Sequence, residues 1–156
     1  MTPARSAIRR FAQTPAASPA VDRILIIRLG ALGDVVRTLP AVEAIRDHYA
    51  EAQVAWLVEP RAAAVLRGQK AIDEILVFPR DVLSRYLSAG RWFAAGRTFY
   101  SFVRELREGR FGLVLDFHSI LKSGILARLS GSSQRCLLYT SPSPRDYAAS
   151  RMPSSA

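Results

Sequence analysis

The sequence predicts an α/β fold, a Rossmann-like parallel sheet flanked by helices. Short apolar runs rich in β-branched residues alternate with segments of helical period between residues 23 and 131. Such runs are typical of strands buried on both faces, and strand–helix alternation gives parallel strands joined by right-handed crossovers. Ligands of these sheets bind beyond the carboxyl ends of the strands. The loops that follow the strands are therefore the candidate site.

Residues 24–27 (Ile-Leu-Ile-Ile) predict the first strand, and a glycine turn over residues 30–33 follows it. Apolar residues then recur at steps of three and four from Val35 to Tyr49, which predicts an amphipathic helix. Pro40 falls inside this pattern, so we expect the helix to kink or to begin anew there.

The alternation continues along the chain. Residues 54–58 predict the second strand, and Pro60 opens a short helix that ends near Gly68. Residues 75–78 predict a third strand, closed by Pro79. The segment after it has no clear period and is expected to be irregular. The remaining elements are a helix marked by Phe99, Phe102, Val103 and Leu106 that stops at Gly109, a strand over 111–117, and a helix over 121–129 that stops at Gly131.

The chain divides into three parts by composition. Residues 1–21 are rich in Ala, Pro and Ser with three arginines, which predicts a disordered basic leader. Residues 22–135 form the predicted Rossmann-like domain. Residues 136–156 lose the hydrophobic period and predict a non-native tail.

The tail resembles a translated sequencing adapter. Residues 136–146 can be back-translated into DNA similar to the transposase adapter of tagmentation libraries, and residues 150–156 into its outer end. A Pro/Ser-rich linker would have the same composition. We favour the adapter because both flanks and their spacing agree, and we therefore expect the natural protein to continue past Arg135.

Composition and charge exclude several classes of protein. The chain has 156 residues, 49% of them hydrophobic, so it is not a disordered polyelectrolyte. No apolar run reaches the ~18–20 residues that cross a bilayer, and a single cysteine excludes an internal disulfide. No secretory signal precedes the first strand, which favours a cytoplasmic protein. The net charge of +9 suggests an anionic partner.

The glycine turn is the strongest local signal. Gly30-Ala31-Leu32-Gly33-Asp34 has the spacing G-x-x-G-D, not the G-x-G-x-x-G of dinucleotide-binding domains. Asp34 places a carboxylate at the predicted helix N-terminus, where a pyrophosphate would otherwise bind. Because two anions would repel each other there, the turn is a poor phosphate cradle.

Two roles are open to Asp34 on the residues alone. It could be an N-cap that accepts hydrogen bonds from free backbone N–H groups, worth about 1 kcal/mol. It could instead be a general base that takes a proton from a substrate hydroxyl. A helix N-terminus favours the ionised carboxylate, which keeps it ready to accept a proton but makes it a weaker base.

Other candidate residues lie at the same predicted edge of the sheet. Glu59 ends the second strand, where a nucleotide-binding domain places its ribose-binding acid, and Arg61 could pair with it or face an anionic ligand. Lys122 could reach across the edge toward an anionic group. Arginines and aromatic residues are interleaved over residues 80–97, which suits acidic sugars, nucleic acid or lipid head groups, or an amphipathic surface segment. Asp116, His118, Lys122 and Ser123 cluster after the fourth strand.

Four stretches in order resemble the N-terminal half of the glycosyltransferase family that contains the lipopolysaccharide heptosyltransferases. These are RILIIRLGALGDVVRTLPAVEAIR, VAWLVEP, IDEILVFPR and FGLVLDFHSILKSGILARLSG. The resemblance implies a GT-B architecture of two Rossmann-like domains. The first binds an anionic glycolipid acceptor, the lipid A–Kdo inner core, and the missing second domain binds the donor ADP-heptose.

The resemblance also assigns roles to residues. It makes Asp34 the catalytic base and places Leu32, Gly33 and Arg37 at the substrate. Lys122 matches the family's L-K-S lysine, and Arg61 and the 80–97 stretch are implied to receive the acidic Kdo sugars. It implies no metal and no cofactor, because ADP-heptose is the donor substrate. It also allows peripheral contact with the cytoplasmic face of the inner membrane.

The resemblance implies inverting heptose transfer. Because the donor domain is missing, we expect the 156-residue chain by itself to be inactive. A stand-alone Rossmann module for a nucleotide is one alternative, and a relative that uses another acceptor or sugar is a second. A nucleic-acid-binding domain has only the charge in its favour, since no recognition motif accompanies it. No nucleic-acid partner is therefore expected.

Overall fold

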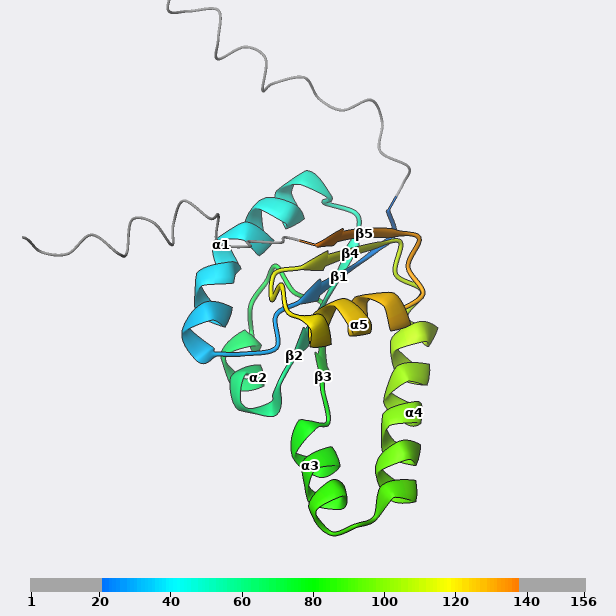
Figure 1. Ribbon diagram of the computed structural model, residues 1–156. Helices are drawn as coiled ribbons and strands as arrows, with labels where there is room; N and C mark the ends of the chain where they lie inside the picture. The colour runs from blue at the N-terminus through cyan, green and yellow to red at the C-terminus, as the bar shows by residue number, and fades with distance from the viewer. Residues whose placement is uncertain (1–20, 138–156) are drawn as a thin grey trace, which may run out of the picture.

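A computed structural model describes residues 21–137 of the chain. Five parallel strands form one sheet in the order β3-β2-β1-β4-β5 (Figure 1). Strand order 3-2-1-4 with crossover helices is the Rossmann pattern, which confirms the predicted fold class. The elements are β1 Arg23–Ile27, α1 Leu32–His48, β2 Gln53–Val58, α2 Pro60–Leu66, β3 Glu74–Val77, α3 Arg80–Ser88, α4 Trp92–Glu108, β4 Leu113–Asp116, α5 Leu121–Leu129 and β5 Gln134–Leu137.

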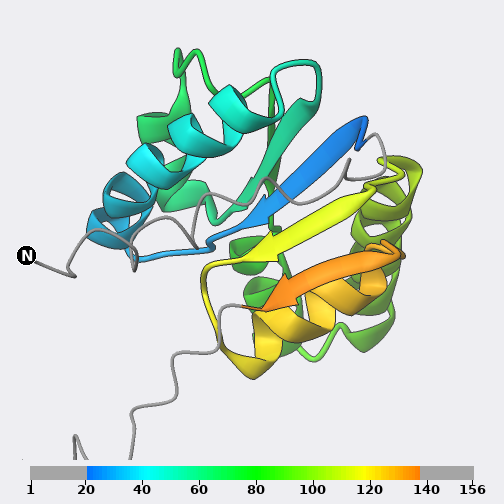
Figure 2. The same ribbon diagram turned by 90° about the horizontal axis from the view of Figure 1, so that it is seen from above.

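The sheet separates two hydrophobic cores because its alternate side chains point to opposite faces. Leu25 and Ile27 of β1 pack with residues of α4 and α5, whereas Ile24 and Ile26 pack with residues of α1 and α2. Figure 2 shows these helix pairs on the two sides of the sheet. The apolar runs that predicted β1 and β2 are thus buried on both faces of the sheet, as expected for its inner strands. Trp56 in β2 is fully buried.

Helix α1 runs without interruption through Pro40, so no second helix begins there. Pro40 is exposed, and the helix buries Val35, Thr38 and Val42. The hydroxyl of Thr38 donates to the carbonyl of Asp34 at 2.7 Å within the first turns. The helix therefore holds Asp34 at a fixed place after β1.

The segment expected to be irregular is a helical hairpin. Helix α3 and the first part of α4 occupy residues 80–97, and a turn at Gly90, with φ of +68°, joins them. The hairpin extends away from the sheet (Figure 1). The expectation was wrong because the segment does carry helical period: Val82, Leu83, Tyr86 and Leu87 lie on one side of α3, although none of them is fully buried.

Strand β5 is an element that the sequence analysis did not predict. It pairs in parallel with β4 and includes Cys136 and Leu137, two residues past the predicted domain boundary at 135. Gln134, Arg135 and Cys136 are exposed, as is common on an edge strand, so no apolar pattern marks it.

The predictions for the leader and for most of the tail concern residues 1–20 and 138–156, outside the described part. The domain limits stay predictions.

None of the helices between residues 21 and 137 has the length and hydrophobicity of a membrane span.

Candidate active site

The carboxyl ends of β1, β2 and β4 bring the predicted site residues to one edge of the sheet. Ile27 and Asp116 are register partners, and the loops that continue these strands carry Asp34 and His118. The β1–α1 turn also lies beside β2, because a Cβ added to Gly30 would be 3.8 Å from the Glu59 carboxylate. The fold therefore brings together charged residues far apart in the sequence.

Asp34 is anchored by Arg28. The Nη2 atom of Arg28 lies 2.5 Å from Oδ2 of Asp34, and Nη1 donates to the carbonyl of Phe117 after β4. Arg28 is largely buried, whereas the Asp34 side chain is 43% exposed. One oxygen of Asp34 is thus fixed from inside the fold while its carboxylate stays accessible from solvent.

The N-cap role considered for Asp34 is wrong. Helix α1 begins at Leu32, its N-cap is Ala31, and no side chain caps it by a hydrogen bond. Asp34 is the third residue of the helix, where its backbone N–H donates to the Ala31 carbonyl. Its carboxylate does not cap the helix. It forms an ion pair with Arg28, near the positive end of the helix dipole.

Glu59 is engaged by two cations from other elements. Its Oε1 accepts from Lys122 at 3.0 Å and its Oε2 from Arg80 at 2.7 Å. Burial alone would raise the pKa of Glu59, but the hydrogen bonds from Arg80 and Lys122 outweigh it and the pKa is lowered. Lys122 also lies 4.4 Å from the ring centroid of Phe78. A ribose-binding acid needs a free oxygen, so these ion pairs count against a nucleotide site at Glu59.

Asp116 orders the loop after β4 rather than facing a ligand. It is 1% exposed, and its Oδ1 accepts from the backbone N–H groups of His118 and Ser119. The hydroxyl of Ser123 donates to Oδ2 at 2.7 Å. Lys122 precedes Ser123, so this buried network fixes the start of α5 and with it the position of Lys122.

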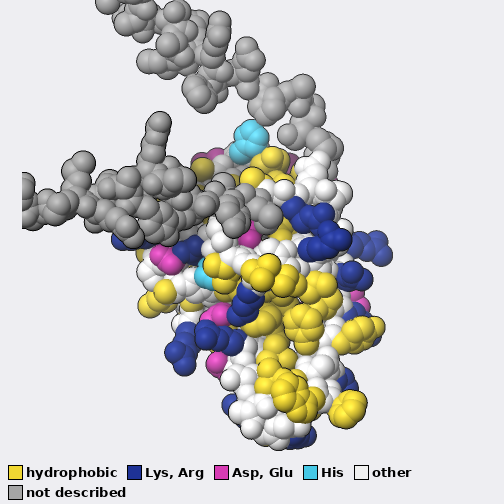
Figure 3. All heavy atoms as spheres, in the orientation of Figure 1, with side chains coloured by type: hydrophobic (Ala, Val, Ile, Leu, Met, Phe, Trp, Pro, Cys, Tyr) yellow, Lys and Arg dark blue, Asp and Glu magenta, His cyan; other side chains and the backbone are white. Residues whose placement is uncertain are grey.

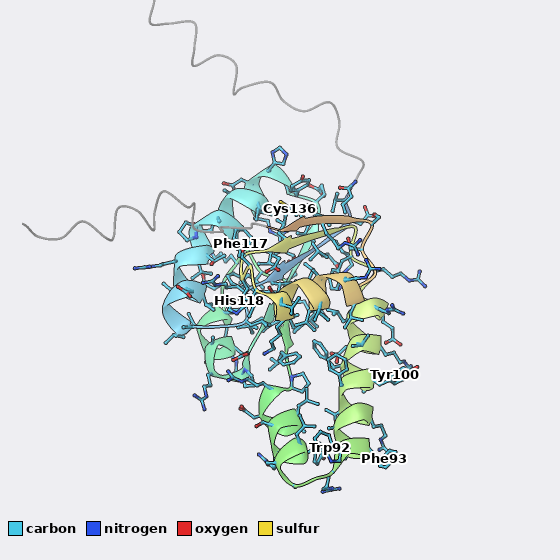
Figure 4. All side chains as sticks on the ribbon, in the orientation of Figure 1. Trp92, Phe93, Tyr100, Phe117, His118 and Cys136 are labelled. Carbon is cyan, nitrogen blue, oxygen red and sulfur yellow. The ribbon has the colours of Figure 1, made fainter. Side chains whose placement is uncertain are left out.

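His118 is half-buried beside these charges. Burial and the nearby charge of Arg28 lower its pKa from the ordinary value of 6.5. Its Nδ1 atom is buried and has no hydrogen-bond partner among residues 21–137. The neutral form of the imidazole is therefore favoured, and its unpartnered Nδ1 lies buried beside the charged cluster. Figure 4 shows His118 and Phe117 together on the loop after β4.

The remaining predicted residues lie around this cluster without joining it. Leu32 and Gly33 form the exposed first turn of α1, and a Cβ on Gly33 would meet nothing within 4 Å. Arg37 is exposed one turn further on α1, and Arg61 is exposed on α2. The expected pairing of Arg61 with Glu59 is wrong, since Arg80 and Lys122 take both oxygens.

The sequence analysis did not predict that Arg28 would pair with Asp34 or that Arg80 would pair with Glu59. Arg28 follows β1 directly, so its position at the carboxyl edge of the sheet could have marked it as a site residue. Arg80 was noted only within the 80–97 stretch. No local spacing connects it to Glu59, because the contact joins the ends of β2 and β3 across the sheet.

No group of three or more His, Cys, Asp or Glu side chains able to hold a metal occurs in the described part of the chain. A hollow of about 500 Å³ opens between the end of β3 and α4, lined in part by Arg97, Tyr100 and Arg104. It does not border Asp34. The carboxyl edge remains the candidate site because the charged groups converge there.

The fold is that of one Rossmann-like domain of a GT-B glycosyltransferase. The solved structure of a glycosyl transferase family 9 protein from Veillonella parvula superposes with a TM-score of 0.63 at 21% identity, over 77% of this chain and 33% of that one. E. coli heptosyltransferase WaaC with ADP-2-deoxy-2-fluoro heptose gives a TM-score of 0.59 at 24% identity, over 69% of this chain and 33% of that one.

The sequence is similar to curated lipopolysaccharide heptosyltransferases 1. The Pseudomonas aeruginosa protein is 29% identical over 115 residues, 71% of this chain, and the Salmonella typhimurium protein is 29% identical over 108 residues, 67% of it. The resemblance stated from the motifs is confirmed. The chain spans about a third of the length of these relatives, 30% and 32%. No protein-family model matches it.

Proposed function

We propose that the chain is the acceptor-side domain of an inverting glycosyltransferase that moves heptose from ADP-heptose to an anionic glycolipid of the lipid A–Kdo type. The similarity to lipopolysaccharide heptosyltransferases 1 supports the reaction class. The observation that carries the proposal is the Asp34 carboxylate, accessible at the carboxyl edge and fixed there by Arg28.

Asp34 acts as the general base. Its carboxylate accepts the proton of an acceptor hydroxyl within about 3 Å, and the hydroxyl oxygen attacks the anomeric carbon of the donor. The bond between that carbon and the ADP oxygen breaks on the opposite face, and ADP leaves with the bonding electrons. Attack and departure on opposite faces invert the anomeric configuration. The proton remains on Asp34 until solvent removes it.

The acidic sugars of the acceptor bind to cations around Asp34. Lys122 is held at the edge by Glu59 and by the network of Ser123, with its side chain part exposed. Arg37 and Arg61 are exposed on the two helices that follow β1 and β2 and have no ion pair among residues 21–137. Charge-assisted hydrogen bonds from such groups to sugar carboxylates are stronger than neutral ones.

Donor binding belongs to a second domain. Asp34 lies where a dinucleotide-binding domain holds pyrophosphate, so this edge disfavours the ADP group electrostatically. The 156-residue chain is accordingly expected to bind acceptor sugars and to show no heptose transfer.

Titration of the chain with a soluble Kdo disaccharide, followed by calorimetry, tests this function. We expect binding that weakens about tenfold in Lys122→Met and Arg61→Gln, since each removes one charged contact. The control is Arg67→Gln, an exposed arginine beyond α2. Binding of ADP without binding of the disaccharide would support the nucleotide module instead.

A further inference from the structure

Three arginines from three elements line one hollow at the ends of α4 and α5. Arg107 of α4, Arg128 of α5 and Arg135 of β5 surround a space of about 410 Å³. The other lining residues are Ile125 and Leu129 of α5, so none of the five is acidic. Figure 3 shows basic side chains gathered on the side of the molecule where α5 ends. We call this space the arginine hollow.

The arginine hollow lies at the opposite edge of the sheet from the candidate site. Helix α5 starts beside the Asp116 network at the carboxyl edge and runs back along the sheet, so Arg128 near its end lies at the amino edge. Arg135 is the register partner of Val114, near the start of β4. A ligand of the hollow would not contact Asp34, and the inference therefore goes beyond the proposed function.

The positive charge of the hollow is not neutralised by the residues around it. None of the ion pairs among residues 21–137 includes Arg107, Arg128 or Arg135. Glu108, which follows Arg107 in α4, is paired with Arg104 at 2.7 Å. Three like charges around one space repel one another, so an anion bound between them stabilises the arrangement.

Arg107 is held in place by α5. Its Nε donates to the carbonyl of Leu129 at 3.1 Å, at the end of that helix. This hydrogen bond satisfies a carbonyl that a helix end leaves unpaired, and it uses one of the five N–H donors of the guanidinium. The Nη1 and Nη2 groups carry the other four donors and can face a ligand.

Phosphate is the anion that suits three guanidinium groups. The N–H groups of a guanidinium match phosphate oxygens in paired hydrogen bonds. A phosphate monoester has three terminal oxygens and a charge of about −1.5 to −2 near pH 7, whereas a carboxylate has two oxygens and a single charge. Ile125 is 48% exposed beside the arginines, and this gives an apolar part of the ligand a surface to cover.

We propose that the arginine hollow binds the phosphate group of a small phosphate ester, whose apolar part packs on Ile125 and Leu129. Its volume of about 410 Å³ falls within the roughly 300–1,000 Å³ of small-molecule sites. An acidic protein would need a contact of about 800 Å² on each partner, whereas the hollow is confined to the ends of three elements. None of the lining residues is aromatic, so nothing there stacks the bases of single-stranded nucleic acid.

An NMR titration of the 156-residue chain with phenyl phosphate tests the proposal. We expect the backbone amide signals of residues 125–135 to shift while those of Asp34 and Lys122 stay unchanged, which separates this site from the proposed acceptor site. Inorganic phosphate lacks the ring and should bind about tenfold more weakly. Benzoate has the ring but a single negative charge, and should also bind about tenfold more weakly.

Two matched comparisons of variants assign the contacts. Arg128→Gln and Arg135→Gln should each weaken phenyl phosphate binding about tenfold because each removes one charged contact, while Arg67→Gln, at an exposed position beyond α2, should not. Ile125→Ser should abolish the preference for phenyl phosphate over inorganic phosphate. Leu121→Ser, at an exposed position on the same helix outside the hollow, should keep that preference.

Four results would overturn the proposal. The first is phenyl phosphate binding that Arg128→Gln and Arg135→Gln leave unchanged. The second is an equal affinity for phenyl phosphate and for either of the other two anions. The third is a shift of the Lys122 signal in place of the signals of residues 125–135, and the fourth is no shift with any of the three anions.

Discussion

Arg28, directly after β1, forms an ion pair with Asp34 in the first turn of α1 and also binds the loop after β4. Nη2 of Arg28 lies 2.5 Å from Oδ2 of Asp34, and Nη1 donates to the carbonyl of Phe117. The guanidinium is largely buried, so its position is set by the fold rather than by solvent. Arg28 therefore acts as a positioning residue for the proposed base.

Replacing Arg28 should lower turnover more than acceptor affinity. In a form of the enzyme that includes the donor domain, Arg28→Gln should reduce kcat on the order of ten- to a hundredfold, because a misplaced base loses its approach to the hydroxyl. Arg28→Lys should recover part of the loss. Steady-state kinetics that show a raised acceptor KM with an unchanged kcat would assign Arg28 to acceptor binding instead.

Lys122→Met should reduce stability at neutral pH by no more than about 1 kcal/mol, because the pair with Glu59 is partly exposed. The pKa of Glu59 is lowered below its ordinary 4.5, so the pair stabilises the fold above that pH and this stabilisation is lost as pH falls through the folded-state pKa. Urea unfolding at several pH values should therefore show that the free energies of unfolding of the wild type and Lys122→Met converge as the pH falls. A difference independent of pH would contradict this.

His118 should make the fold sensitive to mild acid. Its pKa is lowered in the folded state, so below the ordinary value of 6.5 the unfolded chain binds a proton that the folded chain does not. Stability should fall as pH decreases from 6.5 toward the folded-state pKa. His118→Gln should remove that part of the pH dependence, measured as the urea midpoint between pH 7 and 5. An unchanged slope in the variant would contradict the prediction.

Ser123→Ala should destabilise the fold by about 1–3 kcal/mol, because the buried Asp116 carboxylate loses a hydrogen bond and Ser123 is itself fully buried. Ser101→Ala, at an exposed position on α4, is the matched control and should be neutral. Chemical denaturation of both variants measures this. Equal stability of the two would show that the Asp116 network does not hold the start of α5.

Gly33→Ala should leave the fold intact and weaken acceptor binding. A Cβ at Gly33 meets no atom within 4 Å, and Ala is favoured over Gly in a helix. The added methyl group would, however, occupy the surface that the proposed acceptor approaches beside Asp34. Thermal unfolding and Kdo disaccharide titration separate the two effects. Undiminished affinity would place the acceptor elsewhere.

The strands of the fold could be predicted from the sequence because burial on both faces of a parallel sheet demands continuous apolar runs. Residues 24–27 and 54–58 show this directly. Strand β5 escaped prediction for the converse reason, since an exposed edge strand needs no such pattern. Helix α3 does carry a helical pattern in Val82, Leu83, Tyr86 and Leu87, but the pattern is short and was missed among the arginines around it.

The site could be predicted in part. The G-x-x-G-D turn and the Asp116–Ser123 cluster lie at the carboxyl edge as expected, because strand order alone determines which loops meet there. The partners of individual charges could not be predicted. Glu59 pairs with Arg80 and Lys122 rather than with Arg61, and Asp34 pairs with Arg28 instead of capping α1, since such contacts depend on the registers of neighbouring strands.

In the proposed mechanism Asp34 removes a proton from the acceptor hydroxyl. Heptose transfer from ADP-heptose to a lipid A–Kdo acceptor by Asp34→Asn, in a form of the enzyme that includes the donor domain, tests it most directly. We expect a kcat lower by about 10²- to 10⁴-fold, with ADP-heptose binding unchanged. Wild-type turnover in the Asp34→Asn enzyme would contradict it.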